Sequence, residues 1–232
     1  MSIRYSRQEP AIDQEKLKNV KVGVIGVGAV GSTIADILAR IGTGTIYLFD
    51  NDKVEIHNIA GQRFKEEDIG KPKVKVIENE LKKINSEIDI YAENMKIVKE
   101  SQLPKDLDYI FSGVDNFTAR KVLVDYQKRV NKKVVILDGG LSTPTTGTNQ
   151  MYIHGGKKIT DFYPNFNKEI ESEQKTRCTG ELIPSLVTTS VVIGALRVHQ
   201  FLQHLNDGRE YKDLMNVSMG RKISIDYFGV EK

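Results

Sequence analysis

Short apolar runs alternate with amphipathic stretches along the chain up to Asp138. The runs are rich in β-branched residues, which favours buried strands, whereas the amphipathic stretches repeat apolar residues at helical spacing. This pattern predicts strands at 20–25, 45–49, 88–92, 109–114 and 134–137, and helices at 32–41, 74–84 and 117–130. Strands that alternate with helices build a mostly parallel, doubly wound sheet with helices on both faces. The predicted fold class is therefore α/β.

The pattern changes after Asp138, where threonine, glycine and proline turns replace the alternation. We expect an edge-type strand at 149–154, a mobile crossover loop at 155–177 because that segment is polar and aperiodic, and a helix after Cys178 that runs to about Leu205. Two last strands, 214–219 and 222–228, predict a hairpin and thus a C-terminal antiparallel extension. The whole chain, 1–232, is predicted to be one domain with an N-terminal arm at 1–19.

Composition narrows the classes of partner. The 34 basic and 31 acidic residues are interspersed, so we do not expect a nucleic-acid partner. The most apolar stretch, 182–196, contains proline, serine and threonine and falls short of the roughly 20 apolar residues of a membrane span. It predicts a buried helix and no membrane partner.

The single cysteine, Cys178, rules out an internal disulfide and a Cys-x-x-Cys zinc site, so we expect a cytoplasmic protein without zinc.

A glycine turn joins the first strand to the first helix. Gly26, Gly28 and Gly31 stand at the spacing G-x-G-x-x-G directly after the apolar run. Glycines let the backbone approach a phosphate chain, and the helix that follows presents free N–H groups and a positive dipole end. The turn indicates a Rossmann-like nucleotide-binding domain, but by itself it does not choose the nucleotide.

Three aspartates are expected at the carboxyl edge of the sheet. Asp50 ends the second strand about 20 residues after the glycines, where an acid commonly binds ribose hydroxyls. Asp52 follows it, and Asp115 ends a later parallel strand. Carboxylates beside phosphates favour Mg²⁺, which prefers oxygen ligands. The alternative is that Asp52 and Asp115 are helix caps or loop acids.

Five separated motifs occur in the order that one known family shows. They are Arg4-Tyr5-Ser6-Arg7-Gln8, Asp50-Asn51-Asp52-Lys53-Val54-Glu55-Ile56-His57-Asn58, Gly61-Gln62-Arg63, Gly70-Lys71-Pro72-Lys73, and Val114-Asp115-Asn116 with Arg120. In this order they resemble the ThiF/MoeB/HesA family, the ubiquitin-activating-like adenylyltransferases. The resemblance implies an ATP- and Mg²⁺-dependent enzyme that adenylates the C-terminal carboxylate of a ubiquitin-like or sulfur-carrier protein.

The resemblance also implies roles for particular residues. The catalytic set would be Arg7, Arg63, Lys73, Asp115 and Cys178, and Asp52 and Asp115 would hold Mg²⁺. The nucleotide would contact Gly26, Gly28, Gly31, Asp50, Asp52, Asn58, Gln62, Lys73, Asp115 and Asn116. Arg7 would reach the phosphates of a neighbouring subunit, which implies a homodimer. Lysines and arginines suit this chemistry because the transition state at the α-phosphate is highly negative.

Two residues carry specific ambiguities. Gln62 and Arg63 stand in the reverse of the family's order and one position late, which weakens the assignment of Arg63. Cys178 precedes an apolar helix, beside Arg177, where relatives place a cysteine that accepts the activated partner. A small buried core residue is the alternative for Cys178.

Three other functions remain open at this point. The glycine turn permits an NAD-dependent oxidoreductase, although a catalytic histidine or a Tyr-x-x-x-Lys arrangement is not in place for one. The same fold can adenylate a carboxylate on tRNA or on a peptide. A scaffold half of a heterodimeric activating enzyme would not need the phosphate and metal residues that this chain retains.

Overall fold

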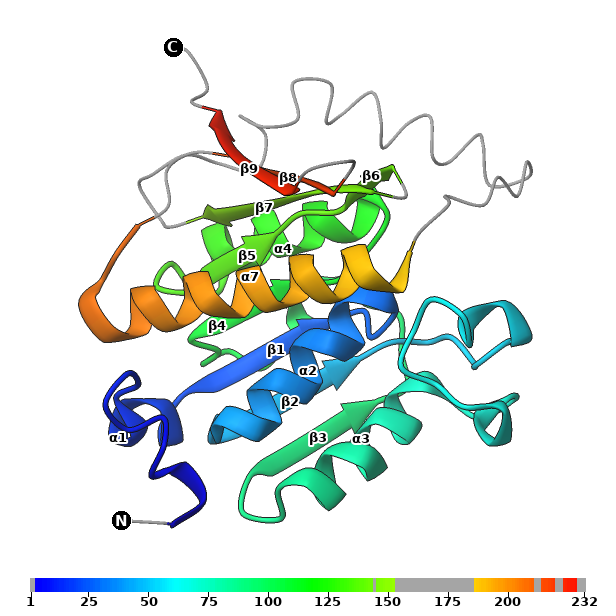
Figure 1. Cartoon of the computed structure of the whole chain (residues 1–232), viewed down its shortest axis with the longest axis horizontal. Helices are drawn as coiled ribbons and strands as arrows, with labels where there is room; N and C mark the ends of the chain where they lie inside the picture. The colour runs from blue at the N-terminus through cyan, green and yellow to red at the C-terminus, as the bar shows by residue number, and fades with distance from the viewer. Residues whose placement is uncertain (1–2, 144, 153–185, 211–213, 220–222, 229–232) are drawn as a thin grey trace.

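A computed structural model describes residues 3–143, 145–152, 186–210, 214–219 and 223–228. The whole of the predicted loop at 155–177 and the start of the predicted helix after Cys178 therefore lie outside the described residues, as does Cys178 itself. Elements are labelled as in Figure 1.

Five parallel strands form the centre of the sheet, in the order β3-β2-β1-β4-β5. They are β1 Lys21–Ile25, β2 Thr45–Phe49, β3 Asp89–Glu93, β4 Tyr109–Ser112 and β5 Val135–Asp138. Chain direction across the sheet reverses between β1 and β4, and open α/β sheets bind ligands outside the carboxyl ends of the strands at such a point. The predicted α/β class and the predicted parallel strands are confirmed.

An antiparallel extension continues the sheet beyond β5. Strand β7 (Thr146–Tyr152) pairs with β5, and β8 (Leu214–Met219) and β9 (Ile223–Phe228) follow in order. The short strand β6 (Leu141–Thr143) pairs with β7 and was not predicted. The structure thus confirms the C-terminal antiparallel extension, and β7 begins three residues earlier than the sequence pattern predicts because the polar run 146–148 pairs with β8.

Helices cover both faces of the sheet, as predicted. Helices α2 (Ala29–Ile41), α3 (Lys73–Ile84) and α7 (Val187–Asp207) lie on one face, and α4 (Phe117–Arg129) lies behind the sheet in Figure 1. Helices α2 and α7 pack closely, since a Cβ on Gly194 would lie 3.0 Å from Thr33 Cγ2. Among the described helices, none has the length and apolar character that a bilayer crossing requires.

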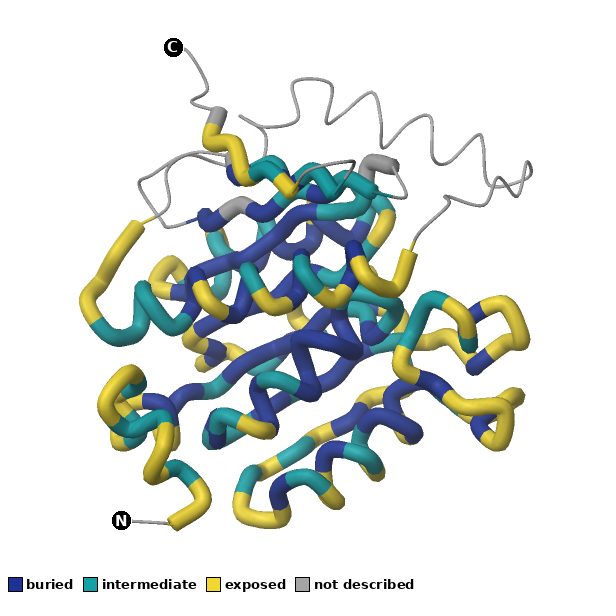
Figure 2. Tube along the Cα trace, in the orientation of Figure 1, coloured by how far each residue is buried: buried dark blue, intermediate teal, exposed yellow. Residues whose placement is uncertain are grey.

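Strands β1, β2, β4 and β5 are largely buried, as Figure 2 shows by their dark colour, whereas β3 at the edge of the sheet is mostly exposed. Val22, Val24, Ile46 and Leu48 are fully buried under α2 and α3, and a second apolar cluster around Ile110 lies under α4. Because such strands face helices on both sides, their sequences read as continuous apolar runs. This is why the sequence pattern located them accurately.

The N-terminal arm contains a short helix that was not predicted. Helix α1 (Gln14–Lys18) begins at Asp13, whose Oδ1 accepts a hydrogen bond from Lys16 N at 3.0 Å. With only Leu17 buried, the helix lacks the repeated apolar spacing from which a helix is predicted.

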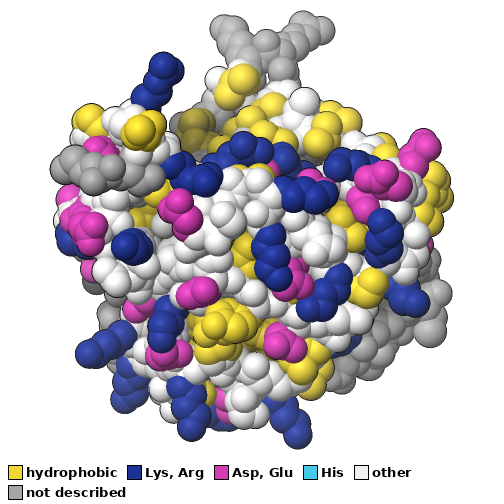
Figure 3. Space-filling model, turned by 90° about the horizontal axis from the view of Figure 1, so that it is seen from below, with side chains coloured by type: hydrophobic (Ala, Val, Ile, Leu, Met, Phe, Trp, Pro, Cys, Tyr) yellow, Lys and Arg dark blue, Asp and Glu magenta, His cyan; other side chains and the backbone are white. Residues whose placement is uncertain are grey.

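In the view of Figure 3, basic and acidic side chains alternate over the face seen from below, in keeping with the interspersed charges of the sequence.

Candidate nucleotide-binding site

The turn between β1 and α2 requires its glycines. Gly26 has a φ of +86°, and its amide donates to Phe49 O at 2.7 Å. A Cβ on Gly31 would lie 1.9 Å from Gly26 O, so α2 starts in direct contact with the turn. The turn thus places the N-terminus of α2, which has no side-chain cap, at the carboxyl edge of β1 and β2. Uncapped amides at a helix N-terminus suit phosphate oxygens.

Gly28 differs from the other two glycines because the space beside it is open. Among the described residues other than its chain neighbours, one atom comes within 4 Å of an added Cβ: Gln62 Oε1, at 3.8 Å. This oxygen is buried, and among the described residues it has no hydrogen-bond partner. A buried acceptor without a partner is costly unless something donates to it. Gln62, predicted to bind nucleotide, therefore lies beside the open part of the glycine turn with an unused acceptor.

Asp50 holds the turn in place. Its Oδ2 accepts from Val27 N and its Oδ1 from Asp52 N, both at 2.8 Å. Burial raises the pKa of Asp50, while the hydrogen bonds from the amides of Asp52 and Val27 oppose that rise. Each carboxylate oxygen has a second lone pair, so ribose hydroxyls can still donate to Asp50 at the predicted position.

Lys73 returns to the end of β2 from the start of α3. Its Nζ lies 3.1 Å from Asp52 Oδ2, and its amide donates to Asp52 O at 2.9 Å. The Lys73 side chain is 8% exposed, whereas that of Asp52 is 59% exposed. The structure therefore brings together two residues that lie far apart in the sequence and that both carry predicted roles at the phosphates.

Asn58 and Arg63 are engaged with other parts of the protein. Asn58 is buried, and its Oδ1 accepts from Glu55 N at 2.9 Å. Arg63 Nη2 donates to Asp36 Oδ1 at 2.9 Å, and Arg40 Nε binds the other oxygen of the same carboxylate at 2.7 Å. Asp36 lies on α2, so Arg63 is held against the helix that follows the glycine turn.

The loop after β4 carries Asp115 and contacts the glycine turn. Gly113 N donates to Ile25 O at 2.7 Å, and a Cβ on Gly113 would lie 2.4 Å from Gly26 O. Asp115 is exposed, and its Oδ1 accepts from Asn116 Nδ2 at 3.3 Å. The described residues contain no cluster of three or more His, Cys, Asp or Glu arranged to hold a metal.

The capping interpretation of the aspartates does not hold. The residue that caps α4 is Asn116, whose Oδ1 accepts from Ala119 N at 2.8 Å, and the N-cap of α3 is Pro72. Asp52 and Asp115 are therefore not helix caps. Asn116, predicted to bind nucleotide, has its side-chain oxygen engaged in the cap.

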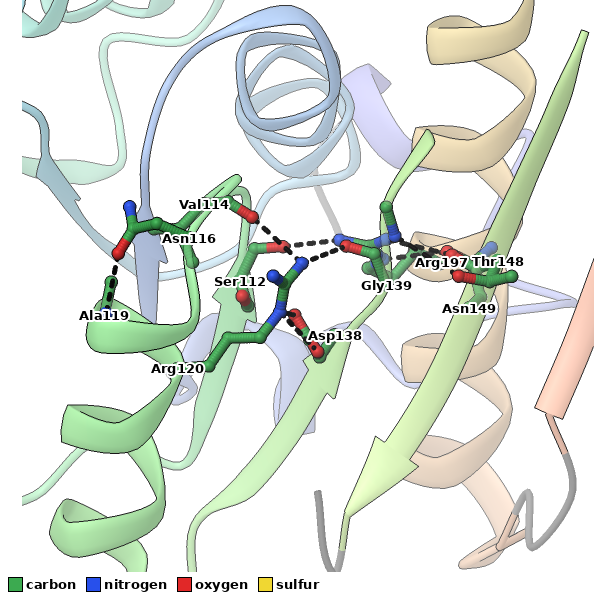
Figure 4. Close-up of polar contacts among 11 residues, drawn as sticks. Ser112, Val114, Asn116, Ala119, Arg120, Asp138, Gly139, Thr148, Asn149 and Arg197 are labelled. Carbon is green, nitrogen blue, oxygen red and sulfur yellow. Dashed lines mark hydrogen bonds and ion pairs between the residues drawn. The ribbon is translucent and has the colours of Figure 1, made fainter. Parts of the chain in front are cut away.

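Two buried arginines lie at this edge (Figure 4): Arg120, which the sequence offered only as part of the Asp115 motif, and Arg197, which it did not single out. Arg120 pairs with the fully buried Asp138 through Nε, at 3.2 and 3.1 Å from Oδ1 and Oδ2. Arg197 of α7 is also fully buried, and its Nη1 donates to Ser112 O at 2.6 Å. A signal existed in the sequence, because Arg197 is the single Lys, Arg, Asp or Glu between Val187 and Phe201.

Arg7 lies far from these groups within its own chain. Its neighbours in the arm pack on the C-terminal end of α2: a Cβ on Gly42 would lie 2.6 Å from the Tyr5 ring, and Gln8 Nε2 donates to Ile41 O at 2.8 Å. Helix α2 spans 13 residues, or about 20 Å, between that end and the glycine turn. Arg7 itself is exposed. Within its own chain, Arg7 therefore lies about the length of α2 from the glycine turn.

A second polar pair lies at the opposite, amino edge of the sheet. Tyr109 OH lies 2.8 Å from Nδ1 of His204. Burial raises the pKa of Tyr109 to about 12 and lowers the pKa of His204. Burial thus disfavours the charged form of both groups, and a hydroxyl and a neutral imidazole share this hydrogen bond. This pair borders an open cavity of about 890 Å³ that includes Lys16, Lys133 and Leu205 and that contains none of the predicted site residues.

Comparisons with known proteins identify relatives among activating enzymes and adenylyltransferases. Ubiquitin-like modifier-activating enzyme 5 of Gallus gallus is 29% identical over 209 residues, which cover 83% of this chain and 52% of the relative. The sulfur carrier protein ThiS adenylyltransferase of Bacillus subtilis (strain 168) is 36% identical over 136 residues, 54% of this chain and 40% of the relative. The chain thus spans about half the length of the curated relatives it matches.

A solved structure shows the same architecture. E. coli MccB, crystallised with AMPCPP and MccA, superposes with a TM-score of 0.81 at 26% identity, over 97% of this chain and 71% of MccB. The profile of the ThiF family matches residues 5–224, which include the glycine turn, the Asp52–Lys73 pair and the Asp115 loop. The chain therefore belongs to the ThiF family.

Proposed function

We propose that this chain uses MgATP to adenylate the C-terminal carboxylate of a ubiquitin-like or sulfur-carrier protein. The observation that carries the proposal is the convergence, where the sheet changes direction, of an uncapped helix N-terminus, Asp50, the Asp52–Lys73 pair and Asp115. The names of two relatives, an activating enzyme for a ubiquitin-like modifier and a ThiS adenylyltransferase, support this class of substrate.

The reaction requires positioned charge more than proton transfer. An ionised carboxylate oxygen of the partner attacks the α-phosphorus of ATP, the bond to the bridging oxygen breaks, and pyrophosphate leaves with the electron pair. No general base is needed, since a C-terminal carboxylate is already ionised at neutral pH. In the proposed mechanism Lys73 contacts the phosphates with its Nζ, Arg63 approaches from α2, and Arg7 enters from a second copy in a homodimer.

The carboxylates present fit a magnesium ion that is shared with the phosphates. Asp52 and Asp115 are exposed carboxylates with free lone pairs, and Mg²⁺ is usually held by one or two carboxylates together with phosphate oxygens. When bound, the ion would neutralise charge on the triphosphate. We assign its protein ligands to these two residues.

Cys178 lies outside the described residues, and its role is a separate part of the proposal. Attack of its thiolate on the acyl adenylate would form a thioester and release AMP. In the alternative, the enzyme stops at the adenylate and Cys178 is a core residue. A Cys178→Ser variant distinguishes the two, because it would retain pyrophosphate exchange but lose any hydroxylamine-sensitive covalent adduct with the partner protein.

Calorimetric titration tests the nucleotide before any partner is known. We expect binding of ATP that depends on Mg²⁺, and little binding of NAD or NADH. Tight binding of NAD with no response to ATP would overturn the proposal in favour of an oxidoreductase. Pyrophosphate exchange with a panel of ubiquitin-like, sulfur-carrier, peptide and tRNA substrates then identifies the carboxylate. The peptide is included because E. coli MccB was solved with MccA.

A further inference from the structure

Two buried guanidinium groups hold the loop that carries Asp115 (Figure 4). Arg197 Nη1 donates to Ser112 O at 2.6 Å, and Arg120 Nη2 donates to Val114 O at 3.1 Å. These two carbonyls stand on either side of Gly113, and Asp115 is the next residue after Val114. The backbone that leads to Asp115 is therefore fixed from α7 on one side and from α4 on the other.

Arg197 is itself held rigidly. Its Nε donates to Asn149 Oδ1 at 2.9 Å and its Nη2 to Thr148 O at 3.3 Å, both on β7. Gly139 has a φ of +147°, and an added Cβ would lie 1.9 Å from Thr148 O and 2.7 Å from Arg197 Nη2, so the β7 backbone and the guanidinium both exclude a side chain there. Arg120 Nη2 also donates to Gly139 O at 3.3 Å. The two arginines thus meet at Gly139.

The complete burial of the charged Arg197 side chain requires a structural explanation. Burying a guanidinium costs several kcal/mol, and apolar side chains of similar volume often stabilise a fold as well or better. What the guanidinium supplies is geometry, since its planar fork makes several hydrogen bonds in fixed directions. Here these bonds link α7 to the end of β4 and to β7, and α7 also packs on α2 through Gly194 and Thr33. One helix therefore contacts both the phosphate-binding helix and the Asp115 loop.

We propose that Arg197 is a positioning residue for Asp115: by fixing Ser112 and the loop that follows, it keeps the Asp115 carboxylate where the metal-bound phosphates of ATP require it. This inference rests on the proposed function of Asp115. Arg197 does not touch the nucleotide in this proposal, and it acts through the backbone of residues 112–115.

A double-mutant cycle on the full-length protein tests this idea, with MgATP binding measured by calorimetry. Arg197→Lys and Asp115→Asn should each weaken binding by about tenfold, and the double variant also by about tenfold instead of a hundredfold, because both changes remove the same contact. The control is Phe201→Leu, one turn along α7, whose ring packs on Tyr109 and Phe111 of β4. Its effect on binding should be small and should add to that of Asp115→Asn.

Additive effects of Arg197→Lys and Asp115→Asn would overturn the proposal, as would an unchanged affinity in Arg197→Lys. If Arg197→Lys does not fold, Asn149→Ser removes the acceptor of Arg197 Nε and takes its place in the same cycle. A second readout needs no ligand: amide hydrogen exchange at residues 113–116 should quicken in Arg197→Lys but not in Phe201→Leu. If exchange at these amides is faster in Arg197→Lys but the wild-type protein does not bind MgATP, the proposed function is rejected. The contact between Arg197 and the Asp115 loop is then retained.

Discussion

Lys73 is a buried cation that meets an exposed anion: its Nζ lies 3.1 Å from Asp52 Oδ2, with side-chain exposures of 8% and 59%. Removing the lysine leaves a carboxylate that water can solvate, so the fold should tolerate Lys73→Met. The phosphates would lose a charge-assisted hydrogen bond worth ~1.5–3 kcal/mol, which corresponds to about a tenfold or greater loss of ATP affinity. Calorimetric titration with MgATP measures it.

Lys71→Met is the matched control for that experiment. Lys71 precedes α3 by two residues and pairs with Asp68 at 3.2 Å, with a side chain that is 55% exposed. Its loss should leave ATP affinity within a factor of two or so, since exposed ion pairs contribute little. Equal losses in both variants would mean that Lys73 acts through general surface charge and not at the phosphates.

Substitutions at two glycines of the turn should distinguish an effect on folding stability from an effect on ATP binding. Gly31→Ala places a Cβ 1.9 Å from Gly26 O and should cost about 3 kcal/mol or more of stability. Gly28→Ala meets nothing closer than Gln62 Oε1 at 3.8 Å, so the unliganded protein should unfold at nearly the same temperature. The added methyl would occupy space that the phosphates need. Normal ATP binding by Gly28→Ala would exclude this turn as the phosphate site.

Arg63 and Arg40 share one carboxylate, which provides a paired comparison. Both donate to Asp36, at 2.9 and 2.7 Å, so each Ala variant removes one ion pair from the same residue. If Arg63 contacts phosphates, Arg63→Ala should weaken MgATP binding by about tenfold while Arg40→Ala changes it little. Matching effects would assign Arg63 to a structural ion pair with Asp36.

Arg7 offers a test of the homodimer. Because the arm around Arg7 packs on the end of α2 opposite the glycine turn, Arg7 can reach a nucleotide only in a neighbouring copy. Arg7→Ala and Asp115→Ala should each be inactive in pyrophosphate exchange. Mixing the two should restore about a quarter of the wild-type rate, since random pairing gives hybrid dimers that contain one intact site. Without any recovery on mixing, Arg7 does not act across an interface.

His204 should make stability depend on pH. Burial lowers its pKa below the usual 6.5, so the unfolded chain takes up a proton before the folded chain does as the pH falls. The contribution of the neutral imidazole is complete above pH 6.5 and is lost as the pH drops through the folded-state pKa. Thermal unfolding between about pH 7.5 and about pH 5 should show a smaller decrease in His204→Gln than in wild type. His199→Gln, at an exposed position on the same helix, should behave as wild type.

The sequence predicted the parallel sheet well because four of its five strands, all but β3, are largely buried and read as continuous apolar runs. The bounds predicted for β2 and β8 agree with the structure, and the glycine turn, Asp50 and Asp115 were placed at the correct edge. Helix α1 was missed because it is short and buries only Leu17, and strand β6 was missed because it has only three residues.

The sequence did not predict which side chains pair with one another. The pattern gave no sign that Arg63 binds Asp36, that the Asn116 oxygen caps α4, or that Arg120 and Arg197 hold the Asp115 loop. Such pairings join residues up to 85 positions apart, and only the register of strands and helices brings them into contact.

The contact of Gly113 with Gly26 has a consequence for engineering. Because a Cβ on either glycine would collide with the backbone of the other, the β1–α2 turn and the β4–α4 loop form one surface built from two distant stretches of sequence. Grafting a different nucleotide specificity onto this scaffold by replacing the first turn alone would leave a mismatched second half. A chimera should therefore exchange both loops together, from the same donor.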